Sequence, residues 1–264
     1  MPLIFEELTH KIRCCIYNLH NTVGVGYDEE TYHNGLKHIF RKKQIPYSSR
    51  KTKELKYREE KIKSMEYDLL VYDKIILELK NLQTDFVQAN YVQLISYLKH
   101  WKKNLGLLVN FGLPKVYIKR IPFSEKEKNI YENYEYIKNC ISQEERLVLG
   151  KIRKAILNIY NDQGLGYGNL IYSKMVKIEL NYQKIQYLKE PVIKVTLDNI
   201  CLREYPISHF LIDNRVLLDV IALHEKIQFY DVAKTRTYLQ ALKLKTGLIV
   251  NFGKRQLQIL GVRV

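Results

Sequence analysis

The sequence contains an internal repeat, and this feature constrains the fold more than any other. The motif GVGY at 24–27 returns as GLGY at 164–167, 140 positions later. The motif GLLVNFG at 106–112 returns as GLIVNFG at 247–253, at an offset of 141. The helical apolar pattern around residues 12–19 also recurs 140 positions later. Because the matches share one register, they indicate a tandem duplication.

A chain of 264 residues is long enough for two domains of ordinary size. We predict an N-terminal domain over 1–122 and a C-terminal domain over 142–264. The charged, tyrosine-rich segment 123–141 is expected to be a linker, and the motif SQEE at 142–145 predicts a capped helix start. In the first copy, periodicity predicts helices over 4–19, 27–42 and 86–103, and strands over 67–72, 75–80, 105–111 and 116–121.

The stretch Asp68–Lys80 is the strongest candidate for chemistry. It has the pattern of two short strands joined by a tight turn. Since side chains alternate across a strand, Glu78 and Lys80 should leave the same face. Burying charged side chains on a strand that is covered on both faces costs free energy, which favours a functional reason for their presence. With Asp68 on the partner strand, two carboxylates and a lysine could form a site for a hard divalent cation. The alternative is an ordinary structural salt bridge between Glu78 and Lys80.

The second copy keeps the framework positions but loses these polar residues. The replacements are Glu29 by Asn169, Asp68 by His209, Glu78 by Asp219, Lys80 by Ile221 and Gln93 by Lys234. Structural salt bridges would be needed by both copies, so their selective loss favours a functional role in the first. With Ile221 in place of the lysine, we expect no cation at the second site. One carboxylate, Asp219, is too little to hold a hard cation, so the second copy should be inactive.

The charge of the chain indicates a polyanionic partner. The net charge is +15, and both predicted domains are basic: 21 basic against 13 acidic residues in 1–122, and 19 against 11 in 142–264. Such a balance favours nucleic acid binding, although lysine-rich composition can also reflect an AT-rich genome. The candidate phosphate contacts are Arg50, Lys51, Lys99, Lys102 and Lys103.

Composition also argues against several other classes of protein. No apolar run approaches the roughly 20 residues of a membrane span, and the N-terminus lacks a signal-peptide pattern. We therefore expect no membrane partner and a soluble, cytoplasmic protein, in the host cell if the source is viral. The four cysteines, Cys14, Cys15, Cys140 and Cys201, show no C-x-x-C spacing, so neither a zinc site nor a disulfide framework is indicated.

Taken together, the motifs resemble the GxxExxY family of the PD-(D/E)XK nuclease superfamily. The segments that carry the resemblance are Gly24-x-Gly26-x-x-Glu29-x-x-Tyr32, Asp68 followed by Glu78-x-Lys80, Gln93-x-x-x-Tyr97-Leu98-Lys99 and GLLVNFG at 106–112. Residues 145–260 resemble the same family without its active site. The resemblance implies an α/β fold with two tandem domains, each a central mixed sheet flanked by helices. It also implies Mg²⁺-dependent cleavage of DNA.

The resemblance further implies a metal site in the first copy. Asp68 and Glu78, with the carbonyl of Leu79, would hold one or two Mg²⁺ ions, for which Mn²⁺ should substitute. Lys80 would position the attacking water and offset the charge that develops during cleavage. Glu29 would orient a metal-bound water or ligate directly.

Two residues of the third helix complete the expected site. Gln93 and Tyr97 are four apart, share a helix face and would contact the phosphate or Lys80. For Tyr97 a packing role is an equal alternative, because Tyr238 occupies the same position in the second copy.

CRISPR-associated exonucleases of the same superfamily are similar in their core, as is a nuclease of a giant-virus virophage-defence system. These relatives often carry four cysteines for an iron–sulfur cluster, and the cysteine spacing here predicts none. The competing interpretation is a catalytically silent DNA-binding scaffold, against which the intact site of the first copy argues. The second copy is expected to clamp DNA or to form a homodimer interface.

Overall fold

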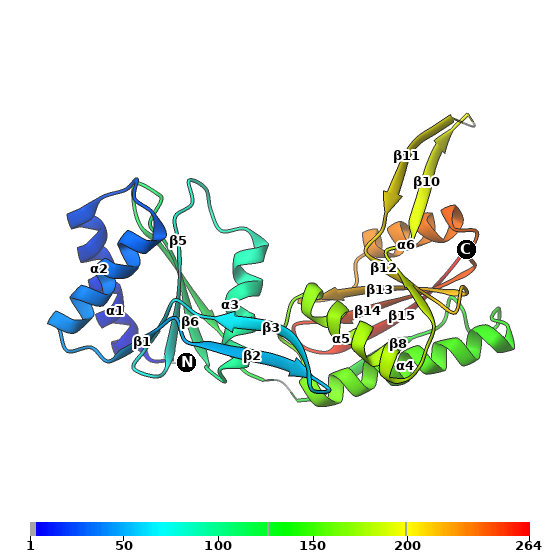
Figure 1. The fold of residues 1–264 in the computed structure, drawn as a ribbon, viewed down its shortest axis with the longest axis horizontal. Helices are drawn as coiled ribbons and strands as arrows, with labels where there is room; N and C mark the ends of the chain where they lie inside the picture. The colour runs from blue at the N-terminus through cyan, green and yellow to red at the C-terminus, as the bar shows by residue number, and fades with distance from the viewer. Residues whose placement is uncertain (1–3, 126, 199) are drawn as a thin grey trace. The chain divides into compact units, whose positions relative to one another are not determined.

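The computed structural model describes residues 4–125, 127–198 and 200–264, and it divides into two compact units. One unit comprises Met1–Leu55 with Lys63–Glu125, and the other comprises Lys56–Ile62 with Lys126–Val264. Each unit contains a mixed sheet flanked by helices (Figure 1). The mixed α/β fold with two sheet-containing halves is therefore confirmed.

In the N-terminal half the predicted helices and strands are present, with ends that shift by a few residues. The helices are α1 (Glu6–Val23), α2 (Glu29–Lys42) and α3 (Gln88–His100). The strands are β1 (Tyr47–Ser49), β2 (Thr52–Tyr57), β3 (Glu60–Glu66), β4 (Leu69–Val71), β5 (Ile75–Lys80), β6 (Leu105–Asn110) and β7 (Tyr117–Pro122).

The main sheet of this unit has the order β1-β4-β5-β6-β7, while β2 and β3 form a sheet of their own. Only β5 and β6 of the main sheet are parallel. Parallel neighbours need a crossover connection, and α3 supplies it. The crossover brings α3 onto one face of the sheet, opposite the face covered by α1 and α2 (Figure 1).

The alternation predicted for β5 sets the two faces of the site. Leu77 and Leu79 belong to the buried cluster formed with α1 and α2. The side chains between them therefore point toward α3. On that side α3 approaches the sheet closely: a Cβ added to Gly106 on β6 would lie 2.7 Å from Leu94 of the helix. Glu78 and Lys80 consequently lie in the layer between β5 and α3.

The C-terminal half repeats the order of elements. Its helices are α4 (Gln143–Gln163), α5 (Asn169–Tyr182) and α6 (Phe229–Ala241). Its strands are β8 (Ile130–Asn133), β9 (Tyr187–Lys189), β10 (Val192–Leu197), β11 (Ile200–Pro206), β12 (His209–Ile212), β13 (Val216–Ala222), β14 (Thr246–Phe252) and β15 (Leu257–Arg263). The sheet order is β8-β15-β14-β13-β12-β9, with β13 and β14 parallel like β5 and β6. The capping box predicted at Ser142 is present: its hydroxyl accepts from the N–H of Glu145.

The segment 123–141 is more than the linker that its composition suggested. It contains β8, which pairs in parallel with β15 at the edge of the second sheet. The buried side chain of Ile137 packs against Gly261 of β15. Short length and exposed residues such as Ile130 hid this strand from periodicity.

The motifs shared by the two copies are structural. In the first copy the Tyr32 hydroxyl donates to the Gly24 carbonyl at 2.9 Å, and its ring stacks on Phe111 at 4.5 Å. The second copy repeats both contacts with Tyr172, Gly164 and Phe252. Gly24 has a φ of 80°, a conformation that favours glycine. The repeat survives because it joins the loop after the first helix to the sheet.

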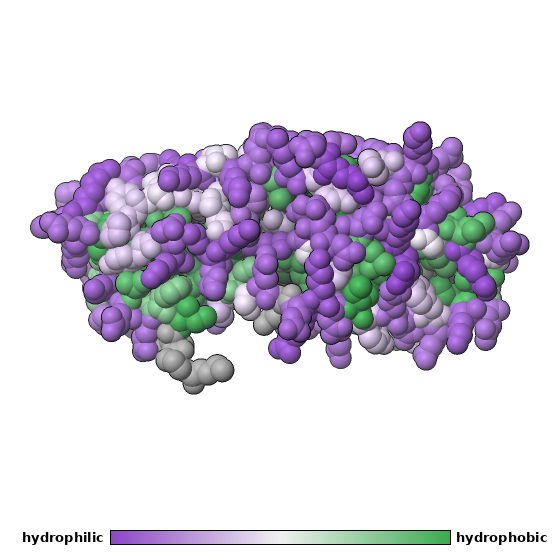
Figure 2. All heavy atoms as spheres, turned by 90° about the horizontal axis from the view of Figure 1, so that it is seen from below, coloured by the Kyte–Doolittle hydropathy of each residue, from purple (hydrophilic) through white to green (hydrophobic). Residues whose placement is uncertain are grey.

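The molecular face in Figure 2 is mostly hydrophilic, and hydrophobic side chains show there in separate patches. None of the helices in the described part of the chain combines the length and apolarity needed to cross a membrane.

Candidate functional site

The central pair of the candidate site lies on β5. The Lys80 ammonium donates to Glu78 at 2.7 Å, so the two side chains share a face, as strand alternation predicted. Only 2% of Glu78 is exposed, and its second oxygen, Oε2, is buried without a hydrogen-bond partner. Burial, helped by the nearby charge of Asp68, raises the pKa of Glu78 to about 8. A buried carboxylate oxygen without a partner is destabilising unless a ligand satisfies it.

Electrostatics keeps the lysine of this pair charged. Burial alone would lower the pKa of Lys80, but the carboxylates of Glu78, Glu29 and Asp68 outweigh it and raise that pKa. The ammonium is thus a fixed positive charge inside a cluster of carboxylates.

Asp68 lies near the Glu78–Lys80 pair because it directly precedes β4, the strand next to β5. The β4 ladder stops where Leu69 faces Leu77, so the next outward N–H of β5, that of Leu79, has no partner on β4. The Asp68 carboxylate accepts this N–H at 2.7 Å. Asp68 is thus held by the residue next to Glu78 at the carboxyl end of β5, near enough for its charge to act on Glu78.

Glu29 also reaches this end of β5. It is the first residue of α2, and its carboxylate accepts the backbone N–H of Asn81, the residue after Lys80, at 3.3 Å. The Asn81 side chain donates to the Tyr27 carbonyl at 2.7 Å. Asn81 thus ties the glycine loop to the site, a role that sequence reasoning missed; its position directly after β5 was the available signal.

Gln93 and Tyr97 form the α3 side of the site. The Gln93 amide donates to the Tyr97 hydroxyl at 3.0 Å. Tyr97 is buried, and burial together with the charge of Glu78 raises its pKa. Gln93 and Tyr97 thus bind each other, and Tyr97 interacts electrostatically with Glu78.

The asparagine of the GLLVNFG motif shapes the loop that follows β5. Asn110 is fully buried opposite Lys80 in the β5–β6 ladder. Its amide donates to the carbonyls of Leu82 and Thr84 and accepts from the N–H of Gly112. Asn110 therefore has a structural role beside the site.

The basic candidates fall into two groups, and the first lies next to Asp68. The backbone N–H of Arg50 donates to the Asp68 carbonyl at 3.2 Å, and its guanidinium pairs with Glu30. Lys51 follows Arg50 and is exposed. His33, which the sequence did not single out, is buried here with a ring nitrogen 2.9 Å from the Ser49 hydroxyl.

The second group lies at the opposite end of β5. Lys103 pairs at 2.9 Å with Asp73, which precedes β5, whereas Lys80 ends it, roughly 20 Å away along the strand. Lys102 is exposed nearby, and Lys99 is buried and lies 3.7 Å from Glu125. The structure does not bring these three lysines to the carboxylates, because α3 runs back along the sheet.

The donors present fit a divalent metal ion that keeps most of its water. Among residues 4–125, 127–198 and 200–264, no group of three or more His, Cys, Asp or Glu side chains could hold a metal ion. Mg²⁺, however, usually keeps several of its waters, so two carboxylates are enough to bind it. Asp68 and Glu78, with its unpartnered Oε2, supply that set.

In the second copy the same position holds a different cluster. The Asp219 carboxylate lies 2.8 Å from the Lys234 ammonium and 3.3 Å from a ring nitrogen of His209. The expectation of no cation here is therefore wrong. Ile221 did remove the strand lysine, but Lys234 reaches the carboxylate from α6, at the position that Gln93 has in the first copy.

The family model of the PD-(D/E)XK nuclease superfamily matches residues 6–121 and again residues 146–262. The search of the curated proteins found no significant match. A crystal structure of SSO0001 is similar at 18% sequence identity, over 35% of this chain and 48% of that one, with a TM-score of 0.29. The chain thus spans about half of that structure.

Proposed function

Because the chain belongs to the PD-(D/E)XK nuclease superfamily, we propose that it is a Mg²⁺- or Mn²⁺-dependent deoxyribonuclease with one active site. That site lies in the domain 1–122, and the domain 142–264 is an inactive copy that binds DNA or forms a homodimer. Within the superfamily we assign the chain to the GxxExxY family, on Gly24, Glu29 and Tyr32. The observation that carries the proposal is the pair of buried Glu78 with Lys80 beside Asp68.

The metal ligands in this proposal are Asp68, Glu78 and the carbonyl of Leu79. Asp68 is held against β5 by the Leu79 N–H, and Glu78 is held by Lys80. A bound Mg²⁺ ion would polarise the scissile phosphate and lower the pKa of a bound water. It would also give Glu78 Oε2 the partner that it lacks.

Lys80 is the residue assigned to the attacking water. Its ammonium stays protonated among the carboxylates and can donate to a water and to a phosphate oxygen. A fixed cation in a site of low dielectric stabilises the negative charge that develops on the phosphate.

Glu29, Gln93 and Tyr97 would complete the site. Glu29 is held at the carboxyl end of β5 by the Asn81 N–H, where its carboxylate can orient a water. The Gln93–Tyr97 pair faces β5 from α3 and offers amide and hydroxyl groups to a phosphate oxygen.

DNA would be bound mainly through its phosphates, since the charge is spread over both halves. Arg50 and Lys51 are the proposed contacts beside the active site. Lys99, Lys102 and Lys103 are proposed contacts farther along the duplex, at the other end of β5.

The experiment that tests the function compares the wild-type protein with Asp68→Ala, Glu78→Ala and Lys80→Ala in a DNA cleavage assay. We expect cleavage by the wild type with Mg²⁺ or Mn²⁺, none with a chelator, and none by the variants. DNA binding is measured in parallel. A wild type that binds DNA and never cuts it would establish the scaffold alternative.

A further inference from the structure

The tip of the β2–β3 hairpin is held in the second unit by one buried carboxylate. Glu179 on α5 is fully buried and accepts hydrogen bonds from four side chains. The Tyr57 hydroxyl donates at 2.5 Å, and the Arg58 guanidinium donates to both carboxylate oxygens. The remaining donors are the amides of Asn158 at 2.8 Å and Gln183 at 2.7 Å.

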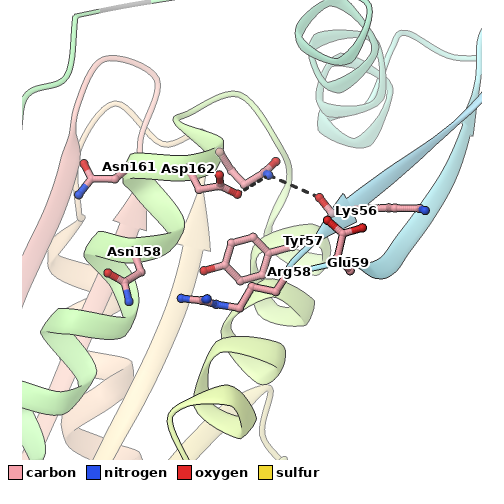
Figure 3. A pocket seen from close by; sticks show the side chains of 8 residues that line it. Lys56, Tyr57, Arg58, Glu59, Asn158, Asn161 and Asp162 are labelled. Atoms are coloured by element: carbon pink, nitrogen blue, oxygen red, sulfur yellow. Dashed lines mark hydrogen bonds between the residues drawn. The ribbon is translucent and has the colours of Figure 1, made fainter.

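Further contacts restrain the same tip. The Arg58 guanidinium lies 3.7 Å from the centre of the Tyr182 ring, and Lys174 donates to the Ile62 carbonyl at 3.1 Å. Figure 3 shows Tyr57 and Arg58 extending from the tip toward Asn158 on α4. Burial alone would raise the pKa of Glu179, but its hydrogen bonds, first those from Arg58 and Tyr57, lower it to about 2. The Glu179 carboxylate is thus charged at neutral pH, and hydrogen bonds stabilise that charge.

The base of the same hairpin carries a residue of the active site. β3 ends at Glu66, and Asp68 follows two residues later. Arg50 precedes β2, and its backbone N–H donates to the Asp68 carbonyl, which joins the two chain segments at the base of the hairpin. β2 and β3 form a two-stranded sheet of their own. Such a hairpin is only marginally ordered unless other contacts hold it.

We propose that Glu179 is a positioning residue for the active site: by holding Tyr57 and Arg58 at the tip, it fixes the hairpin whose base carries Asp68. The inactive copy then contributes to catalysis by restraint, without chemistry of its own. This inference rests on the proposed function, in which Asp68 is a metal ligand. A misplacement of about 1 Å at a reacting centre can lower a rate about a hundredfold.

The hydrogen bonds from Tyr57 and Arg58 to Glu179, which we call the clamp, are specific to the β2–β3 hairpin. At the equivalent positions of the other copy, Glu179 corresponds to Ile39, and Tyr57 and Arg58 correspond to Leu197 and Asp198. The β10–β11 hairpin therefore cannot repeat these hydrogen bonds. The hydrogen bonds to Glu179 are therefore not among the contacts that the two copies share.

The test measures Mn²⁺ binding by electron paramagnetic resonance in the full chain, together with the Mg²⁺ dependence of DNA cleavage. The variants are Glu179→Gln, Arg58→Met and the double variant. Glu204→Gln is the matched control, since Glu204 pairs with Lys194 on the exposed face of the equivalent hairpin. We expect each clamp variant to bind Mn²⁺ roughly tenfold more weakly, with a similar rise in the half-saturating Mg²⁺ concentration. The double variant should bind Mn²⁺ as well as either single variant does, because both substitutions remove the same contact.

A residue that only stabilises the fold would change the melting temperature and leave the metal affinity of the folded protein unchanged. If Glu179→Gln does not fold, Tyr57→Phe, which removes one hydroxyl, decides the matter with an expected weakening of about threefold. Clamp variants that bind Mn²⁺ as tightly as the wild type would overturn the inference, even when the wild type cleaves DNA. A wild type that binds Mn²⁺ through Asp68 and cuts no DNA would overturn the proposed function and leave the inference standing.

Discussion

Lys234 lies 2.8 Å from Asp219 and neutralises, from α6, the carboxylate that corresponds to Glu78 of the first copy. In the first copy the neutralising lysine is Lys80, on the same strand as the carboxylate. The difference matters because Asp219 also has His209 at 3.3 Å, where the first copy has the acidic Asp68. The Lys234 charge offsets that of Asp219 and would repel a second cation there, whereas in the first copy Asp68 adds negative charge beside Glu78.

This arrangement predicts a structural role for Lys234. Replacing it in Lys234→Met leaves the buried Asp219 without its main partner. We expect a loss of roughly 2–3 kcal/mol in unfolding free energy, somewhat below the range for fully buried pairs because the lysine is partly exposed. Urea unfolding measures the loss. DNA cleavage at a temperature where the variant is folded should stay within about threefold of the wild type. A variant as stable as the wild type would contradict the account.

The duplication offers a matched pair of tyrosines. Tyr32→Phe and Tyr172→Phe each remove a hydroxyl that donates to a glycine carbonyl. Each should destabilise the protein by about 1 kcal/mol in urea unfolding. Only Tyr32→Phe should also slow cleavage, because Tyr32 lies one helical turn from Glu29 on α2. Equal effects of the two changes on cleavage would mean that the first copy is not the active one.

The low pKa of Glu179 predicts a pH dependence of stability. Its pKa is about 2 in the folded protein against an ordinary value of 4.5. A carboxyl with a lowered pKa stabilises the fold above its ordinary pKa, and this contribution is lost as pH falls from about 4.5 to about 2. Between pH 4.5 and 3 the wild type should lose up to about 1.4 kcal/mol per pH unit more than Glu179→Gln. Urea unfolding at several pH values tests this, and parallel curves would refute it.

Binding to DNA should depend steeply on salt. Each phosphate contact that is removed should lower the slope of log affinity against log salt by about one. We expect Arg50→Gln and Lys51→Gln each to weaken binding of unrelated duplexes by similar factors, as measured by fluorescence anisotropy. Sequence-dependent losses, or affinities that ignore salt, would argue against phosphate contacts at these positions.

The parts of the fold that depend on local patterns could be predicted from the sequence. Strand alternation, which has a period of two residues, was enough to place Glu78 and Lys80 on one face of β5. The capping box at Ser142 likewise depends on residues three apart. Asp68 was predictable because a short hairpin brings its two strands together.

The remaining features depend on contacts between distant elements. Lys234 reaches Asp219 from another element, so an alignment of the two copies showed Lys234 in place of Gln93 but not its contact with Asp219. The charge of Lys103 indicates a phosphate contact, but the crossover places this residue at the far end of β5. The hydrogen bond of Tyr57 to Glu179 joins residues 122 positions apart, and no periodicity reports such a contact.

The central claim is that one of two similar sites cleaves DNA, and one assay tests it directly. Glu78→Gln and Asp219→Asn make the same isosteric change, replacement of a buried carboxyl group by an amide, at equivalent positions of the two copies. Both are compared with the wild type for initial rates of DNA cleavage in Mg²⁺, after circular dichroism has shown them folded. We predict that Glu78→Gln loses at least about a hundredfold in rate, because a metal ligand is gone, and that Asp219→Asn stays within about threefold. Full activity in Glu78→Gln, or an equal loss in folded Asp219→Asn, would contradict the account.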